Sequence, residues 1–194
     1  MSKAIFPVFY AGNIAYYRGL TQSEVCFEIC ENFPKQTFRS RMLITGPNGS
    51  QLLAIPTVKT GLRRTMKDVK ISYAEDWQKD HWKSLEASYR RSPYFEYYEH
   101  LFFPFYKEKK ETLLEFNLEL LDTILKILSL ELPYSQSEKY SDYENDFRGH
   151  SFELKTEEIK QYTQVFNDRQ EFAPNLSILD AIFNLGPQTT MLLK

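Results

Sequence analysis

Short apolar and alternating segments fill the first 75 residues of the chain and predict β-strands there. Residues 4–10 are almost wholly apolar, as in a buried strand, and residues 24–31 alternate large apolar side chains with smaller or polar ones. Gly46-Pro47-Asn48-Gly49 is a strong turn signal between two extended segments. The pattern predicts a hairpin around that turn and strands at residues 4–10, 24–31, 36–45, 51–58 and 69–73.

The rest of the chain shows the 3.6-residue periodicity of amphipathic helices. Asp76 and Thr112 are good N-cap residues, and Pro93 suits the first position of a helix. Gly186 lies just past the end of the last periodic segment, which is typical of a helix C-terminus. The pattern predicts helices at residues 14–20, 76–91, 94–106, 112–128, 157–164 and 177–185, and an extended surface loop at 132–150.

These elements favour an α/β fold in a single domain that spans residues 1–194. The strands come from the N-terminal half and most helices from the C-terminal half, so we expect a mixed sheet packed with helices. Only the strand–helix–strand unit at residues 4–31 fits a parallel crossover, and its helix is short for that role. An α+β arrangement is the alternative.

The composition is that of a globular protein without a strong overall charge. Hydrophobic residues make up 42% and charged residues 26%, and the net charge of -2 gives no field toward nucleic acid or membrane. No apolar run reaches the roughly 18 residues of a membrane span, and the N-terminus lacks a signal-peptide pattern. Cys26 and Cys30 on an extended segment lie roughly 13 Å apart, too far for a disulfide. We therefore expect a reduced, cytoplasmic protein.

Positive charge is concentrated in residues 32–74, which hold eight cations and a single anion, Asp68. Residues 131–171 reverse the balance, with ten acids and five bases. Either the two regions complement each other across the fold, or the basic one forms an anion site. The cations are spread over loops without an RNA-binding motif, so we expect an anionic small molecule or glycan precursor as partner and no nucleic acid.

Arg39 and Arg41 alternate along one of the extended segments. Two guanidinium groups on one strand face can grip a phosphate or carboxylate bidentately. The alternative is an ordinary solvated strand face. The charge excess of the surrounding segment favours the anion site.

His81 lies on the apolar arc of the helix at residues 76–91, together with Trp77 and Tyr89. It is a candidate general acid or base tuned by partial burial, and the alternative is a core histidine with one hydrogen bond. No second histidine stands four residues away, so a metal site is not expected. The chain has no glycine-rich nucleotide-binding or nucleophile-elbow motif, and we expect no cofactor.

Polar residues also cluster at the last helix and at the first strand–helix junction. Asp180 is an alternative base, but Ser177 and Asp180 also fit a capping box. Tyr10 and Asn13 lie where α/β proteins often bind ligands, although core packing explains most tyrosines there. Asn117 interrupts the apolar face of a long helix, where it either fixes packing to a backbone group or points into a pocket.

The order and spacing of three blocks resemble the WbqC-like protein family. The blocks read FEICENFPKQTFRSRMLITGPNGSQLLAIP, ISYAEDWQKDHWKSLEASYRRSPYFEYYE and FAPNLSILDAIFNLGP. The resemblance covers nearly the whole chain. Two departures bear on specificity: many members have Gln-Pro where this chain has Phe6-Pro7, and many have Asn where this chain has Ser40.

The resemblance implies a bacterial protein from surface-polysaccharide (O-antigen) gene clusters. It implies a transferase of an acyl, glycyl or related group, acting in surface-polysaccharide or nucleotide-sugar metabolism. A non-catalytic binding or accessory protein for glycan biosynthesis is the alternative. The resemblance assigns no catalytic residue. Combining it with the residue chemistry, we expect His81 and Asp180 to be catalytic, and substrate to contact Tyr10, Asn13, Arg39, Arg41, Trp77, Tyr89, Ser92, Asn175 and Asn184.

Overall fold

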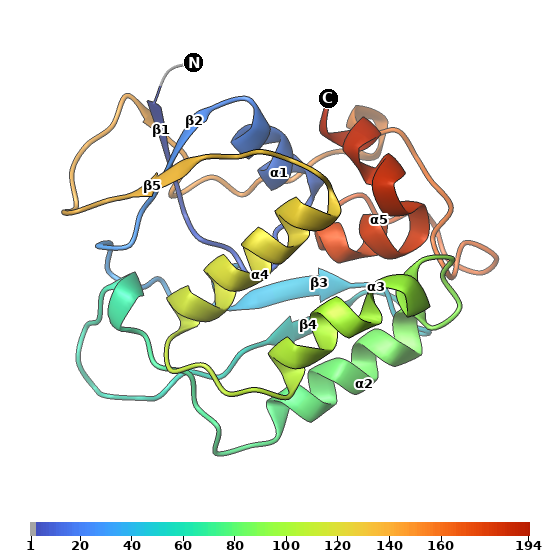
Figure 1. Cartoon of the computed structure of the whole chain (residues 1–194), viewed down its shortest axis with the longest axis horizontal. Helices are drawn as coiled ribbons and strands as arrows, with labels where there is room; N and C mark the ends of the chain where they lie inside the picture. Colours follow the sequence, from blue (N-terminus) through green and yellow to red (C-terminus); the bar gives the residue numbers. More distant parts are fainter. Residues whose placement is uncertain (1–2) are drawn as a thin grey trace.

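Two small β-sheets and five α-helices form the fold of residues 3–194, the part that the computed structural model describes (Figure 1). Short 3-10 helices, labelled η, connect several of them. The elements in chain order are β1 (Lys3–Phe6), α1 (Ile14–Thr21), β2 (Glu24–Phe27), β3 (Arg41–Ile44), β4 (Gln51–Ala54), η1 (Met66–Asp68), α2 (Trp77–Tyr89), α3 (Phe95–Phe102), η2 (Phe103–Tyr106), α4 (Leu113–Ile127), β5 (Tyr134–Gln136), β6 (Asn145–Asp146), η3 (Thr156–Glu158), α5 (Ile178–Leu185) and η4 (Gly186–Leu193).

The larger sheet is parallel throughout and has the strand order β5-β2-β1-β6. The predicted crossover at the start of the chain is confirmed: β1 and β2 pair in parallel, and α1 connects them. The apolar side chains of both strands are buried, which explains the near-continuous hydrophobic runs in their sequences. All four strands therefore end at one carboxyl edge of this sheet.

The two outer strands of that sheet come from residues 132–150, where the sequence pattern predicts a loop. That prediction is wrong at β5 and β6, which are only three and two residues long and mostly polar. Strands this short have no visible periodicity, and their pairing depends on the neighbours β2 and β1. The sheet thus draws on both halves of the chain.

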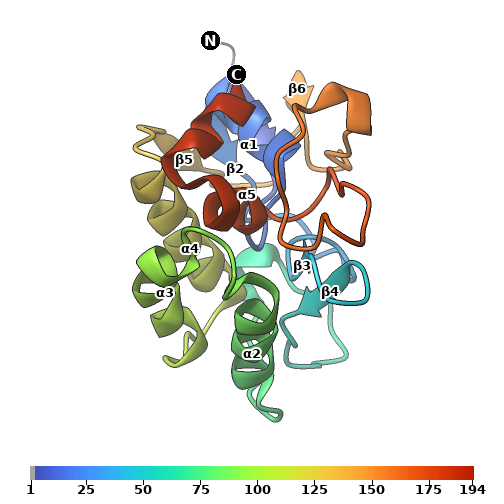
Figure 2. The same ribbon diagram turned by 90° about the vertical axis from the view of Figure 1, so that its right-hand side faces the viewer.

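The hairpin around Gly46–Gly49 is confirmed as the antiparallel pair β3–β4, which forms a separate sheet. Gly49 has φ +113°, a backbone conformation that favours glycine. Parallel and antiparallel pairing therefore both occur, as the α/β prediction with a mixed sheet requires, but in different sheets. In Figure 1 the hairpin crosses the middle of the molecule, and Figure 2 shows it on the side away from α3 and α4.

The long helices form where the periodicity predicts them. α2 buries the predicted arc, including His81 and Leu85, and the Thr112 side chain caps α4 by accepting from the Glu115 backbone N–H. The helix predicted at residues 94–106 divides into α3 and η2, because Pro104 cannot continue an α-helical hydrogen-bond pattern.

Two further element predictions are wrong. Residues 69–73 form only isolated bridges, Thr57 to Ile71 and Lys70 to Thr112, instead of a strand. Residues 157–164 contain only the end of the short turn η3 instead of a helix. Both segments are short, so tertiary contacts outweigh local preference.

Helix α5 lies at the centre of the helical half of the core. Phe183 packs its ring against Phe95, Tyr89 and Phe102 at centroid distances of 5.0, 5.1 and 5.4 Å. The helix ends at Gly186, whose φ of +57° is in the left-handed region. The chain leaves α5 there in direct contact with the ring of Tyr94.

Gly186→Ala is expected to lower the free energy of unfolding by about 1–3 kcal/mol, because an added methyl group overpacks the site. Its Cβ would lie 2.5 Å from the Tyr94 Cε1 atom, and the positive φ adds strain. Urea unfolding measures the change. Gly149→Ala is the matched control, since nothing lies within 4 Å of that Cβ. An equal, small effect of both changes would contradict the contact with Tyr94.

Candidate functional site

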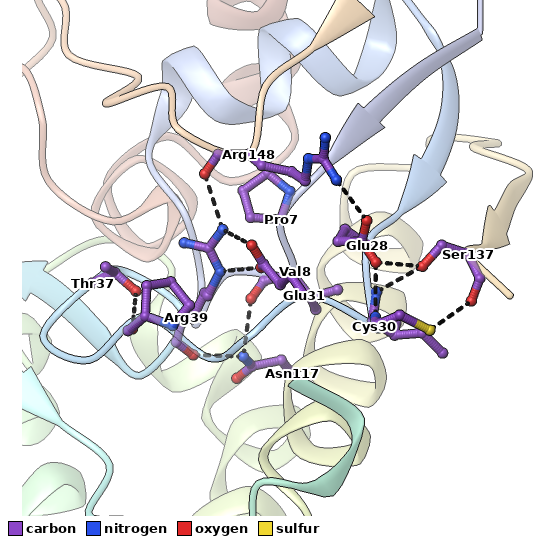
Figure 3. A network of polar contacts seen from close by, with 12 residues as sticks. Pro7, Val8, Glu28, Cys30, Glu31, Thr37, Arg39, Asn117, Ser137 and Arg148 are labelled. Atoms are coloured by element: carbon purple, nitrogen blue, oxygen red, sulfur yellow. Dashed lines mark hydrogen bonds and ion pairs between the residues drawn. The ribbon is translucent and has the colours of Figure 1, made fainter. Parts of the chain in front are cut away.

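A buried ionic network occupies the carboxyl edge of the parallel sheet (Figure 3). Glu28 and Ser137 directly follow β2 and β5, and Arg148 follows β6. Glu28 accepts hydrogen bonds from the Ser137 hydroxyl at 2.6 Å and from the Arg148 guanidinium at 3.0 Å. We call Glu28, Glu31, Arg39, Ser137 and Arg148 the carboxyl-edge network.

Arg39 is held inside this network. Its guanidinium donates to both carboxylate oxygens of Glu31, at 2.5 and 2.9 Å, and to the Arg148 carbonyl at 2.9 Å. Its backbone carbonyl accepts from the Asn117 amide at 2.7 Å, so Asn117 fixes packing to the backbone. Burial raises the pKa of Glu31, and the nearby Arg39 offsets part of that rise. Each charged side chain of the network is paired with an opposite charge inside it. Arg39 is therefore paired with Glu31.

His81 belongs to a second buried chain of hydrogen bonds. Its Nδ1 lies 3.1 Å from the Tyr10 hydroxyl, which lies 2.9 Å from the Tyr106 hydroxyl. Burial lowers the pKa of His81 to about 4, although a hydrogen bond to the Ala54 backbone opposes the shift. The imidazole is therefore neutral near pH 7, with only 5% of the residue exposed.

Asp180 lies in a third network that shares no hydrogen-bond partner with His81. One carboxylate oxygen accepts from the Tyr162 hydroxyl at 2.7 Å and from the Gln164 amide at 2.9 Å. Burial raises the pKa of Asp180 to about 6, and those two hydrogen bonds oppose the shift. Ser177 caps α5 as predicted, but the Asp180 carboxylate turns to Tyr162 and Gln164.

The other predicted binding residues have structural partners. Tyr89 accepts from the Thr45 backbone N–H, Ser92 donates to the Tyr89 carbonyl, and Asn184 donates to the Asp180 carbonyl. Trp77 packs its ring on His81 at 5.0 Å, and its indole Nε1 finds no acceptor within residues 3–194. These side chains lie in the helical core.

Asn13 and Asn175 both line a recess at the first strand–helix junction, but its volume is only about 10 Å³. That is roughly the room of one water molecule. Asn13 caps α1 and donates to the Phe152 carbonyl, while Asn175 pairs with both backbone groups of Leu154. In this conformation the junction is closed to a larger ligand.

A cavity of about 760 Å³ opens instead at the open end of the β3–β4 hairpin. Its walls are the loop after β2, the paired residues Arg41 and Ala54, and the loop that leaves β4. This volume is in the range of small-molecule sites. We call it the basic cleft, because its lining includes the five cations Lys35, Arg41, Lys59, Arg63 and Arg64.

The charge of the basic cleft is not compensated by neighbouring acids. Its lining, as far as residues 3–194 show it, includes no aspartate, glutamate or histidine. None of the five cations forms an ion pair with a carboxylate of those residues, whereas Arg39 and Lys70 pair with Glu31 and Glu111. The Nη1 atom of Arg64 is buried and has no acceptor in the same part of the chain. That nitrogen is inaccessible to a ligand, so it is the five uncompensated cations of the lining that suit an anion.

The sequence of the chain matches a known protein family. The sequence model of the WbqC-like protein family matches residues 13–147 and 136–191. The chain belongs to this family. No curated protein and no solved structure matches it. Both the carboxyl-edge network and the basic cleft of this WbqC-like protein lie within the matched residues.

Of the residues predicted to bind substrate, Arg41 lines the cleft. The other four cations of the lining belong to the same basic segment, but no motif in the sequence marks them as site residues: Lys35, Lys59, Arg63 and Arg64. Their shared signal was the charge excess of residues 32–74. In the described portion of this WbqC-like chain, no helix has the length and apolarity needed to cross a membrane. That portion also contains no group of three or more potential metal-ligating side chains.

Proposed function

We propose that this protein binds an anionic glycan precursor in the basic cleft and acts as a group transferase in cytoplasmic surface-polysaccharide or nucleotide-sugar metabolism. The observation that carries the proposal is the cleft itself, where five cations surround a ligand-sized volume without a neighbouring carboxylate in residues 3–194. The metabolic setting is the one that the resemblance to the WbqC-like family implies.

Fixed positive charge in a partly enclosed site favours reactions that release an anion. When a transferred group leaves a phosphate-type carrier, negative charge grows on the departing oxygen. Guanidinium and ammonium groups already in place stabilise that charge without reorganising. They also hold the reacting group in position, and orientation alone supplies a large share of many rate enhancements.

A specific observation favours the second candidate, a non-catalytic binding protein. Along residues 3–194 the lining of the cleft offers no His, Asp or Glu as acid or base. His81 does not line the cleft, and Asp180 is fully buried in its own network. The acid–base roles of His81 and Asp180 stay predictions. Mass spectrometry of ligand incubated with an alcohol or amine acceptor separates the candidates, since a transferase moves the group to that acceptor and releases the anionic carrier, whereas a binder returns the ligand unchanged.

Arg64→Ala is expected to weaken binding of inorganic phosphate at least tenfold, because it removes a half-buried guanidinium from the lining of the cleft. Titration calorimetry at constant ionic strength measures the dissociation constant. The control is Lys67→Ala, which removes an exposed cation of the same basic segment that does not line the cleft. Equal affinities for both variants, or no phosphate binding by the wild type, would contradict the proposal.

A further inference from the structure

We infer that the basic cleft is built for two linked phosphate groups, so that its ligand is a diphosphate or a diphosphate ester. This inference rests on the proposed function, because it specifies the anion that the cleft binds. It is carried by the number of cations and by their division into two sets of different exposure.

The five cations exceed what a single phosphate can neutralise. A phosphate monoester carries about -1.5 to -2 charges at pH 7. Bound alone, it would leave the charge of roughly three cations uncompensated in a partly enclosed space, where like charges repel more strongly than in water. A second phosphate with a free terminal group, joined to the first, adds about one further negative charge and so reduces this excess.

Exposure divides the cations into two sets. Arg41 and Arg64 are half-buried, whereas Lys35, Lys59 and Arg63 are exposed. The inner set stands on fixed backbone: Arg41 pairs with Ala54 in the hairpin, and the Arg64 carbonyl accepts from the Phe33 N–H at 2.9 Å. Two guanidinium forks match the planar, bidentate geometry that a phosphate accepts. The inner set therefore holds the first phosphate.

The outer set stands on two exposed loops at the mouth of the cleft. Lys59 and Arg63 flank Gly61, whose φ of +71° turns the chain between them. Exposed ammonium and guanidinium groups on such loops reach an anion that protrudes from the inner set. They supply the charge for the second phosphate. Residues of the inner set thus determine binding of any phosphate, and residues of the outer set determine the preference for a diphosphate.

The test compares inorganic phosphate and pyrophosphate as probes in titration calorimetry at one fixed ionic strength. The wild type is expected to bind pyrophosphate at least tenfold more tightly than phosphate. The double variant Lys59→Ala with Arg63→Ala is expected to lose most of that preference while its affinity for phosphate changes less than threefold. Arg64→Ala is expected to weaken both probes.

A second double variant, Lys67→Ala with Lys70→Ala, is the control for net charge. It removes the same two charges from the basic segment, but neither residue lines the cleft, so the pyrophosphate preference is expected to persist. The inference is overturned if the wild type binds both probes equally, or if both double variants lose the preference alike. Failure to bind either probe overturns the proposed function as well, so the two failures are distinguishable.

Discussion

Arg39→Ala is expected to lower the free energy of unfolding by about 3–5 kcal/mol, because removing one partner of a buried ion pair leaves the other charge without compensation. Arg39 is 3% exposed and donates twice to Glu31, itself 7% exposed. It also anchors the Arg148 carbonyl, so its loss loosens two loops at the carboxyl edge. Urea unfolding followed by far-UV circular dichroism measures the change.

Arg41→Ala is the matched control for this prediction. Arg41 stands two residues away and pairs with no carboxylate within residues 3–194, so its loss is expected to change stability by about 0.5 kcal/mol or less. Phosphate binding should show the reverse order, with Arg41→Ala affected and a folded Arg39→Ala protein unaffected. If Arg39→Ala lowers stability no more than Arg41→Ala, the Arg39–Glu31 ion pair contributes no more to stability than an exposed ion pair does.

Asp180→Asn is expected to gain stability relative to the wild type as the pH rises from 4 to 7, by up to about 3 kcal/mol. The folded protein raises the pKa of Asp180 from 3.8 to about 6, so the folded state holds this proton more tightly than the unfolded chain. The stabilising contribution of that proton is fully present below pH 3.8 and is lost as the pH passes 6. Asparagine stays neutral and keeps an acceptor for Tyr162 and Gln164.

The measurement is the difference in unfolding free energy between Asp180→Asn and the wild type at pH 4.5, 5.5, 6.5 and 7.5, about one unit apart across the range in which the shifted carboxyl titrates. Taking the difference cancels the other titrating groups. Asp168→Asn is the control, because that carboxylate is 75% exposed and its variant should run parallel to the wild type. A parallel curve for Asp180→Asn would mean that burial does not raise this pKa.

Local patterns predicted those parts of the fold that local forces decide. The unit β1–α1–β2, the hairpin and α2, α4 and α5 each have a periodicity, a cap or a turn signal within their own residues. β5 and β6 have none, because their three and two residues become strands only through pairing with β2 and β1. Those pairings span more than 100 residues, a separation that no local pattern encodes.

The same limit applies to the candidate site. Alternation along the chain predicted that Arg39 and Arg41 share a face, but the strand β3 begins only at Arg41, and Arg39 turns inward to Glu31. Charge counting predicted an anion site in the segment whose cations line the cleft. It could not distinguish the paired cations from the free ones, because Glu31 meets Arg39 only after the intervening loop has folded back. Arg64 was therefore indistinguishable from its neighbours in the sequence.

β5 and β6 are the edge strands of the parallel sheet and come late in the chain, so the sheet stays incomplete during much of synthesis. β1 and β2 can pair once residue 27 has been made, but the outer edge of β2 stays open until residue 136 and that of β1 until residue 146. At 5–20 residues per second, the 119 residues between residue 27 and residue 146 take roughly 6–24 seconds to translate. For most of that interval both hydrophobic strands present unpaired backbone to other chains. Until then Glu28 is solvated. It becomes buried by Ser137 and Arg148 only when β5 and β6 pair with the sheet.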